Sequence, residues 1–221
     1  AETLIEEALQ RNSASAFAYS LRVRVAPVTA TIESVLEQVP SEYRESPDVL
    51  VALGEAALNR KLYDKAEEWW QIALEGNNDR SMDSIKAFLA VALLEPVAKN
   101  YPLVAAGQLS EHQKHNLERA VSLLTEVLGG EYVNPNDLSH LKFTVLVNRA
   151  SALRLLGRYD EAIRDIEVAR QKEPNDHYLV KQRALLAHEK GDELSAYNYV
   201  SQILSSPQTP EVSLLAASSL M

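Results

Sequence analysis

FTVLVNRASALRLLGRYDEAIRDIEVARQKEPND, residues 143–176, is the stretch that predicts the fold. Its apolar residues recur at spacings of three and four on either side of a turn at Gly157-Arg158-Tyr159. That periodicity is typical of two amphipathic helices joined by a tight turn. The rest of the chain consists of neighbours, copies and distorted versions of this helical pair.

The pattern recurs with a period of 34 residues. Positions one period apart carry the same residue: Gly157 and Gly191, Arg149 and Arg183, Ala150 and Ala184, Ala162 and Ala196. Each unit also has a small residue twelve positions before the anchor of its second helix: Gly54 and Ala66, Ala150 and Ala162, Ala184 and Ala196. Small residues at this spacing indicate two helices that cross closely.

Asn148-Arg149-Ala150, followed by Leu153, Gly157, Tyr159, Ala162, Ala169 and Pro174, closely resembles the tetratricopeptide repeat (TPR) family, whose helix–turn–helix period is 34 residues. Residues 50–73 resemble it too. The resemblance implies an all-α fold: a right-handed α-solenoid of antiparallel helix pairs, here about 11–12 helices. It also implies a concave groove, lined by the first helix of each pair, that commonly binds a peptide or protein.

In this register, residues 1–221 form one array of repeats. One repeat is expanded, since Ala66 to Ala120 and Ala120 to Ala162 span 54 and 42 residues. The expected pieces are the end of a preceding repeat (1–10), a degenerate repeat (14–40), a repeat (47–79), the expanded repeat (81–130), two further repeats (143–176 and 177–206) and the first helix of a following repeat (210–221). The role of the insertion at residues 96–110 stays open.

The two ends of the array each carry an unpaired apolar helix. Solenoids usually end in polar caps. We therefore expect a segment of a longer array, or ends that are covered by another domain or by self-association with a second copy.

Several helix ends carry capping signals. Ser13 or Ser15 can cap a helix that runs to about residue 26, and Pro27 fits the start of the next one. Ser110, followed three residues later by Gln113, forms a capping-box pattern. Asp137 is the expected N-cap of the helix in the opening stretch.

Composition excludes several functional classes. The chain has 22 basic and 31 acidic residues, a net charge of −9, which argues against non-specific nucleic-acid binding. It has no cysteine, and no apolar run approaches the roughly 20 residues that span a bilayer. Localisation stays open: the cytoplasm is favoured over the periplasm.

No catalytic constellation stands out. His112 and His115 share a helix face, but the sequence offers no further ligands in a pattern such as HExxH. Gly129-Gly130 lacks the Lys-Ser/Thr of a phosphate-binding loop. The sequence therefore predicts a protein that is not an enzyme and that has no metal or cofactor site.

The register predicts two kinds of buried side chain, a tryptophan and a pair of arginines. Trp70 occupies a core position between helices. Arg149 and Arg183 lie at an interhelical position that is normally apolar, and a buried arginine needs a partner. Asp165 is the expected partner of Arg149.

The repeat register also predicts the positions that line the groove. They are Val51 and Glu55 in the early repeat, and Val147, Asn148, Ser151, Arg154, Leu155, Lys181, Gln182, Leu185 and His188 in the later pair. Relatives that clamp a peptide carboxylate use Lys, Asn and Arg. Asn148 matches one such position, but Tyr178 and Gln182 stand where the next repeat would need Lys and Arg.

The function that these patterns favour is a scaffold or sensor module that binds a peptide or protein through the concave face. Two alternatives stay open. One is a regulatory or substrate-positioning segment of a larger enzyme, such as a signalling ATPase or transferase. The other is a periplasmic spacer of an envelope export system.

Overall fold

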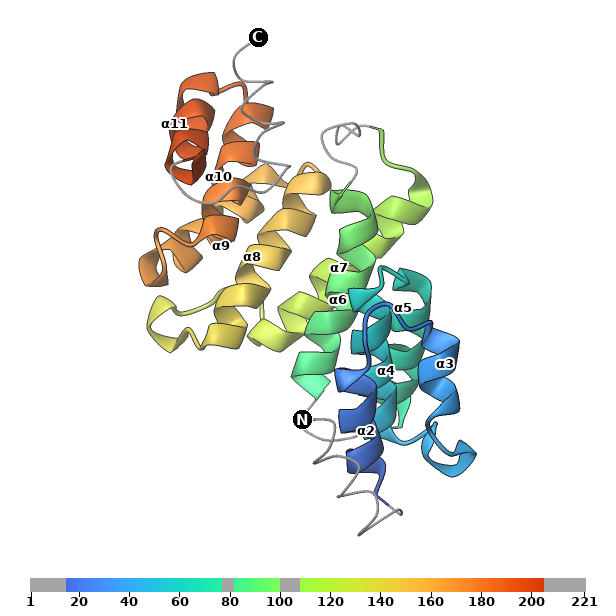
Figure 1. Cartoon of the computed structure of the whole chain (residues 1–221). Helices are drawn as coiled ribbons and strands as arrows, with labels where there is room; N and C mark the ends of the chain where they lie inside the picture. The colour runs from blue at the N-terminus through green and yellow to red at the C-terminus, as the bar shows by residue number, and fades with distance from the viewer. Residues whose placement is uncertain (1–14, 77–81, 100–107, 205–221) are drawn as a thin grey trace. The chain divides into compact units, whose positions relative to one another are not determined.

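The structure is a computed structural model that describes residues 15–76, 82–99 and 108–204. Within these ranges it contains ten α-helices, two short 3-10 helices and no strand (Figure 1). The all-α fold predicted from the sequence is therefore confirmed. The helices predicted at residues 1–10 and 210–221, and most of the insertion at residues 96–110, lie outside the described residues. The chain divides into two compact units, Ala1–Lys99 and Asn100–Met221.

The first unit is a stack of antiparallel helix pairs. Its helices are α2 (Ala16–Val25), α3 (Ile32–Glu37), the 3-10 helix η1 (Ser41–Tyr43), α4 (Pro47–Asn59), α5 (Tyr63–Glu75) and α6 (Met82–Ala98). Helix α4 packs against α2 and α3 on one side and against α5 on the other, and α5 also contacts α6. Each helix therefore buries its apolar stripe between sequence neighbours, as in a solenoid.

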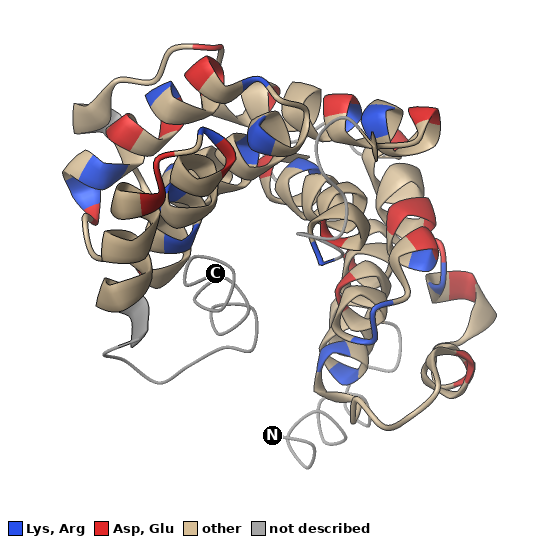
Figure 2. Ribbon diagram, turned by 90° about the horizontal axis from the view of Figure 1, so that it is seen from above, with Lys and Arg blue, Asp and Glu red and all other residues tan. Residues whose placement is uncertain are grey.

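The second unit repeats this arrangement. Its helices are α7 (Glu111–Leu128), the 3-10 helix η3 (Pro135–Asp137), α8 (His140–Leu155), α9 (Tyr159–Lys172), α10 (His177–Glu189) and α11 (Glu193–Leu204). Helix α8 packs against α7 and α9, while α10 packs against α8, α9 and α11. Basic and acidic residues are interspersed along the described helices of both units (Figure 2).

Two predicted caps are confirmed. The Ser15 hydroxyl accepts a hydrogen bond from the Ala18 amide at 3.2 Å and caps α2. At the start of α7, the Ser110 hydroxyl accepts from the Gln113 amide while the Gln113 side chain accepts from the Ser110 amide. This reciprocal pair is a complete capping box and fixes where α7 begins.

Two other predicted helix starts are wrong. The helix expected at Pro27 begins at Ile32, because the Pro27 carbonyl closes a turn with Ala30 and the Thr31 hydroxyl then caps α3. Asp137 is not the N-cap of α8. Asp137 lies in the 3-10 turn η3. Ser139 caps α8 instead, and its hydroxyl accepts a hydrogen bond from the Lys142 amide.

The predicted helix crossings are tightly packed. Ala66, Ala120, Ala162 and Ala196, the anchors of the second helices, are completely buried. Gly54, Ala150 and Ala184, the small residues opposite, are buried as well. The backbones of each pair can approach closely because no large side chain separates them.

Trp70 is a core residue, as predicted. Its indole is completely buried, its Nε1 donates to the Val51 carbonyl at 3.2 Å, and its ring stacks on Phe88 with 5.6 Å between centroids. A Cβ atom added at Gly54 would lie 2.3 Å from that Nε1. The glycine is thus required by the close approach of the indole.

Substitution of Gly54 by Ala should therefore destabilise the first unit. We expect the free energy of unfolding to fall by about 1–3 kcal/mol, since a packed indole must shift to admit the methyl group. The measurement is urea unfolding followed by tryptophan fluorescence. Gly76→Ala is the matched control, because among the described residues its Cβ would meet only the Ile72 carbonyl, at 3.6 Å. A Gly54→Ala variant as stable as the control would contradict this packing.

Candidate functional site

The groove positions predicted for the later repeats lie on two helices of the second unit, α8 and α10. Helices α8 and α10 are the first helices of consecutive repeats, and they contact each other. We call their predicted groove positions the α8–α10 face. It consists of Asn148, Ser151, Arg154, Lys181, Gln182, Leu185 and His188.

Much of the α8–α10 face is buried. Ser151, Arg154, Gln182 and Leu185 are at most 3% exposed, whereas Asn148, Lys181 and His188 are half-buried. The accessible polar groups of the face are therefore the last three. Among the remaining predicted positions, Val147 and Leu155 belong to the buried core.

Arg154 is buried because α10 supplies its partners. Its Nε donates to Gln182 Oε1 at 3.2 Å, and its Nη1 forms an ion pair with Glu189 Oε1. This network ties the C-terminal end of α8 to α10. The sequence register placed Arg154 on the face but did not reveal Glu189 as its partner.

Two buried side-chain oxygens on α8 and α10 have no hydrogen-bond partner among the described residues. Ser151 Oγ and the second carboxylate oxygen of Glu189, Oε2, are buried and accept or donate no hydrogen bond within the described part of the chain. Leaving a buried polar group without a partner costs about 1–3 kcal/mol, so such groups are few in native proteins.

The half-buried groups of the face lie beside ring and carboxylate partners. Lys181 Nζ lies 5.9 Å from the centre of the Tyr178 ring, within the range of a cation–π contact. His188 Nδ1 lies 3.0 Å from Glu193 Oε1. Tyr178 and Gln182 stand where a carboxylate clamp would have Lys and Arg. Tyr178 contributes an aromatic ring beside Lys181, and Gln182 contributes a buried amide.

The two groove positions predicted in the first unit have other contacts. The Val51 carbonyl accepts from Trp70, and Glu55 accepts two hydrogen bonds from Arg24, at 2.8 and 3.3 Å. Val51 and Glu55 are both half-buried on α4. Their role in binding stays a prediction.

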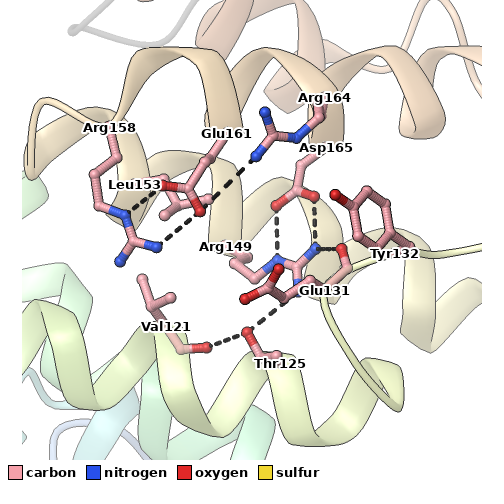
Figure 3. Close-up of a pocket in the computed structure, with 10 residues that line it drawn as sticks. All are labelled: Val121, Thr125, Glu131, Tyr132, Arg149, Leu153, Arg158, Glu161, Arg164 and Asp165. Atoms are coloured by element: carbon pink, nitrogen blue, oxygen red, sulfur yellow. Dashed lines mark hydrogen bonds and ion pairs between the residues drawn. The ribbon is translucent and has the colours of Figure 1, made fainter.

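A second polar cluster surrounds Arg149 (Figure 3). The predicted pair is confirmed: Arg149 Nε and Nη2 donate to the two oxygens of Asp165 at 2.7 and 2.6 Å. Nη1 donates to Thr125 Oγ1 at 3.2 Å and to the Gly130 carbonyl at 3.1 Å, and Nη2 donates to the Glu131 carbonyl at 2.9 Å. One guanidinium therefore joins α7, α8, α9 and the loop that follows α7.

Burial dominates the electrostatics of the Arg149 cluster. It raises the pKa of the Asp165 carboxyl, and the hydrogen bonds from Arg149 oppose that rise. Both side chains are at most 7% exposed. Removing one partner of such a pair leaves an uncompensated buried charge.

Substitution of Arg149 by Leu should lower the free energy of unfolding by about 3–5 kcal/mol at pH 7, the usual cost of breaking a buried ion pair from one side. Without Arg149, the pKa of Asp165 in the folded chain lies still further above its unfolded value. The loss of stability relative to the wild type is therefore full above the pKa of Asp165 in the folded variant, and it shrinks as pH falls toward the lower pKa of Asp165 in the folded wild type. Thermal unfolding at pH 7 and pH 5 measures both effects.

Arg164→Leu is the matched control for this substitution. Arg164 has a largely exposed side chain, and it reaches Glu161 only at 4.0 Å. Its loss should change stability by no more than about 0.5 kcal/mol. Equal effects of the two substitutions would show that the Arg149 cluster is not a stabilising element.

Part of the Arg149 cluster was not predicted from the sequence. The hydrogen bonds to the Gly130 and Glu131 carbonyls depend on the loop conformation, which the repeat register does not specify. One signal in the sequence could have indicated these bonds. Arg149 occupies a core position, and the segment just before it is eight residues longer than the 34-residue period.

The described residues hold no group of three or more His, Cys, Asp or Glu side chains arranged to bind a metal ion. Among the described helices, none combines the length and apolar character needed to cross a bilayer.

Comparison with known proteins identifies the fold. No family model and no curated protein sequence matches the chain. Among solved structures, the chain is similar to YrrB, described as a TPR protein with an unusual peptide-binding site. The match has a TM-score of 0.62 and 13% sequence identity, and it covers 97% of each chain. The resemblance seen in the sequence is thus confirmed, and the chain has the fold of tetratricopeptide-repeat proteins.

Proposed function

We propose that the chain is a non-enzymatic protein-interaction scaffold whose second unit binds an extended polypeptide segment on the α8–α10 face. The observation that carries the proposal is that α8 and α10 contact each other and both present half-buried polar side chains, Asn148 on α8 and Lys181 and His188 on α10. Such side chains can donate to or accept from a polypeptide backbone, which presents N–H and carbonyl groups at regular intervals.

The surrounding groups suit the same ligand. Asn148 can both donate to and accept from a peptide group, and Lys181 can donate to a backbone carbonyl. Arg154 holds Gln182 and Glu189 in place before any ligand arrives. Preorganisation of this kind reduces the ordering cost of binding.

The similarity to YrrB supports this proposal, because that protein is described as having a peptide-binding site on the same fold. The present face differs from a carboxylate clamp, since Tyr178 and Gln182 replace the two cationic residues. We infer that recognition is directed at the backbone and side chains of a segment rather than at a chain terminus.

Selection from a library of displayed peptides tests the proposal. We expect enriched peptides to bind the wild-type protein and to lose about tenfold or more in affinity to the Asn148→Ala/Lys181→Ala variant, since hydrogen bonds to a charged donor are lost. Fluorescence anisotropy with labelled peptides measures the affinities. The two side chains are half-buried, so circular dichroism should show an unchanged fold.

Arg164→Ala serves as the control, because Arg164 is exposed on α9 and is not part of the α8–α10 face. It should bind the selected peptides as the wild type does. Failure to enrich any peptide, or equal affinity of all three proteins, would reject the α8–α10 face as a peptide site.

A further inference from the structure

The second unit contains two crevices at equivalent places in consecutive repeats. The first is lined by α7, α8 and α9 and includes the Arg149 cluster; the second is lined by α9, α10 and α11. Their lining residues correspond in the register. Pairs 34 positions apart are Arg149 and Arg183, Leu153 and Ala187, Arg158 and Asp192, Glu161 and Ser195, Asp165 and Tyr199. Pairs 42 positions apart, across the insertion, are Val121 and Ile163, Thr125 and Glu167.

The first crevice is filled by the chain itself. Eleven residues, 129–139, connect α7 to α8, and the Gly130 and Glu131 carbonyls accept hydrogen bonds from Arg149. The remaining cavity measures about 100 Å³. The loop segment therefore lies in the crevice and is held mainly through its backbone, since the Tyr132 side chain is 84% exposed.

The second crevice has no such loop. Only four residues, 173–176, connect α9 to α10. The cavity measures about 330 Å³, and Ala187 replaces the larger Leu153. Ile166 and Leu186, which are at most 6% exposed, give the second crevice an apolar wall.

Arg183 keeps the guanidinium but lacks the carboxylate. It lies over the Tyr199 ring at 4.3 Å and donates from Nη2 to the Tyr199 hydroxyl at 3.0 Å. It bonds no backbone carbonyl of the described residues. Because a neutral phenol replaces Asp165, the positive charge of Arg183 is not offset by a carboxylate at this position, and it favours carbonyl acceptors.

We propose that the second crevice binds an extended segment of a partner polypeptide whose consecutive backbone carbonyls accept hydrogen bonds from Arg183, as Gly130 and Glu131 accept from Arg149. A side chain of the segment packs on Ile166 and Leu186. The loop that fills the first crevice is thus a model for the ligand of the second.

This site is separate from the α8–α10 face. On α10, Arg183 and Ala187 are each two positions after Lys181 and Leu185, which places them on roughly opposite sides of the helix. The two sites share no residue, so the second crevice extends the proposed function and can fail or succeed independently of it.

The probe is a peptide that copies residues 129–134, Gly-Gly-Glu-Tyr-Val-Asn, acetylated and amidated at its ends. We expect it to bind the whole chain with a dissociation constant between about 10 µM and 1 mM, because a short flexible ligand must be ordered on binding. Methyl NMR should show shifts at Ile163, Ile166 and Leu186 and none at Leu155 or Leu185. No shift at about 1 mM peptide, or shifts confined to Leu155 and Leu185, would overturn the proposal.

Variants of α10 then distinguish the two faces. Arg183→Gln should weaken the probe by about tenfold, because a charge-assisted donor is replaced by a neutral one. Lys181→Ala should bind the probe as the wild type does, although it weakens peptides selected for the α8–α10 face. Equal binding by Arg183→Gln and the wild type would overturn the role of the guanidinium. Should that variant unfold, the methyl map of the wild-type protein decides.

Discussion

The close crossing of two helices at small residues is the constraint on which this structure depends. Each repeat has small residues twelve positions apart on its two helices, such as Ala150 and Ala162, and both are buried almost completely. In the first unit the space saved by Gly54 is taken by the indole of Trp70. Because the crossing fixes the distance between the helices, it also fixes the size of the slots beside it.

One such slot accepts three different chemistries. This slot is formed by two positions: the residue before the small residue of the first helix, and the residue three after the anchor of the second helix. In successive repeats the pair is Leu53 with Trp69, Arg149 with Asp165, and Arg183 with Tyr199. Trp69 packs against the apolar cluster that contains Leu53. The fold therefore does not require an ion pair at this slot, which agrees with the general finding that apolar residues can replace buried ion pairs without loss of stability.

The parts of the structure that follow from periodicity could be predicted from the sequence. The helix pairs, the buried anchors, Trp70 and the pairing of Arg149 with Asp165 all depend on spacing alone. The starts of α3 and α8 could not, because Thr31 and Ser139 compete with nearby turn-forming residues for the cap and local geometry decides between them. The burial of Arg154 was also missed, since its partner Glu189 lies 35 positions away and outside the repeat motif.

Because this slot can hold an apolar pair, the contribution of the two arginines can be separated from packing. Since Leu53 and Trp69 satisfy the packing, the distinctive contribution of Arg149 is its bonds to the Gly130 and Glu131 carbonyls, which anchor a loop longer than the repeat requires. Arg183 occupies the same slot beside a short connection, where there is no such loop to anchor. One N–H donor of Arg183 is bonded to the hydroxyl of Tyr199. Arg183 lines an open crevice with an apolar wall. The ligand that we propose for it is a backbone segment, and the preceding repeat shows how an arginine in this position binds backbone carbonyls.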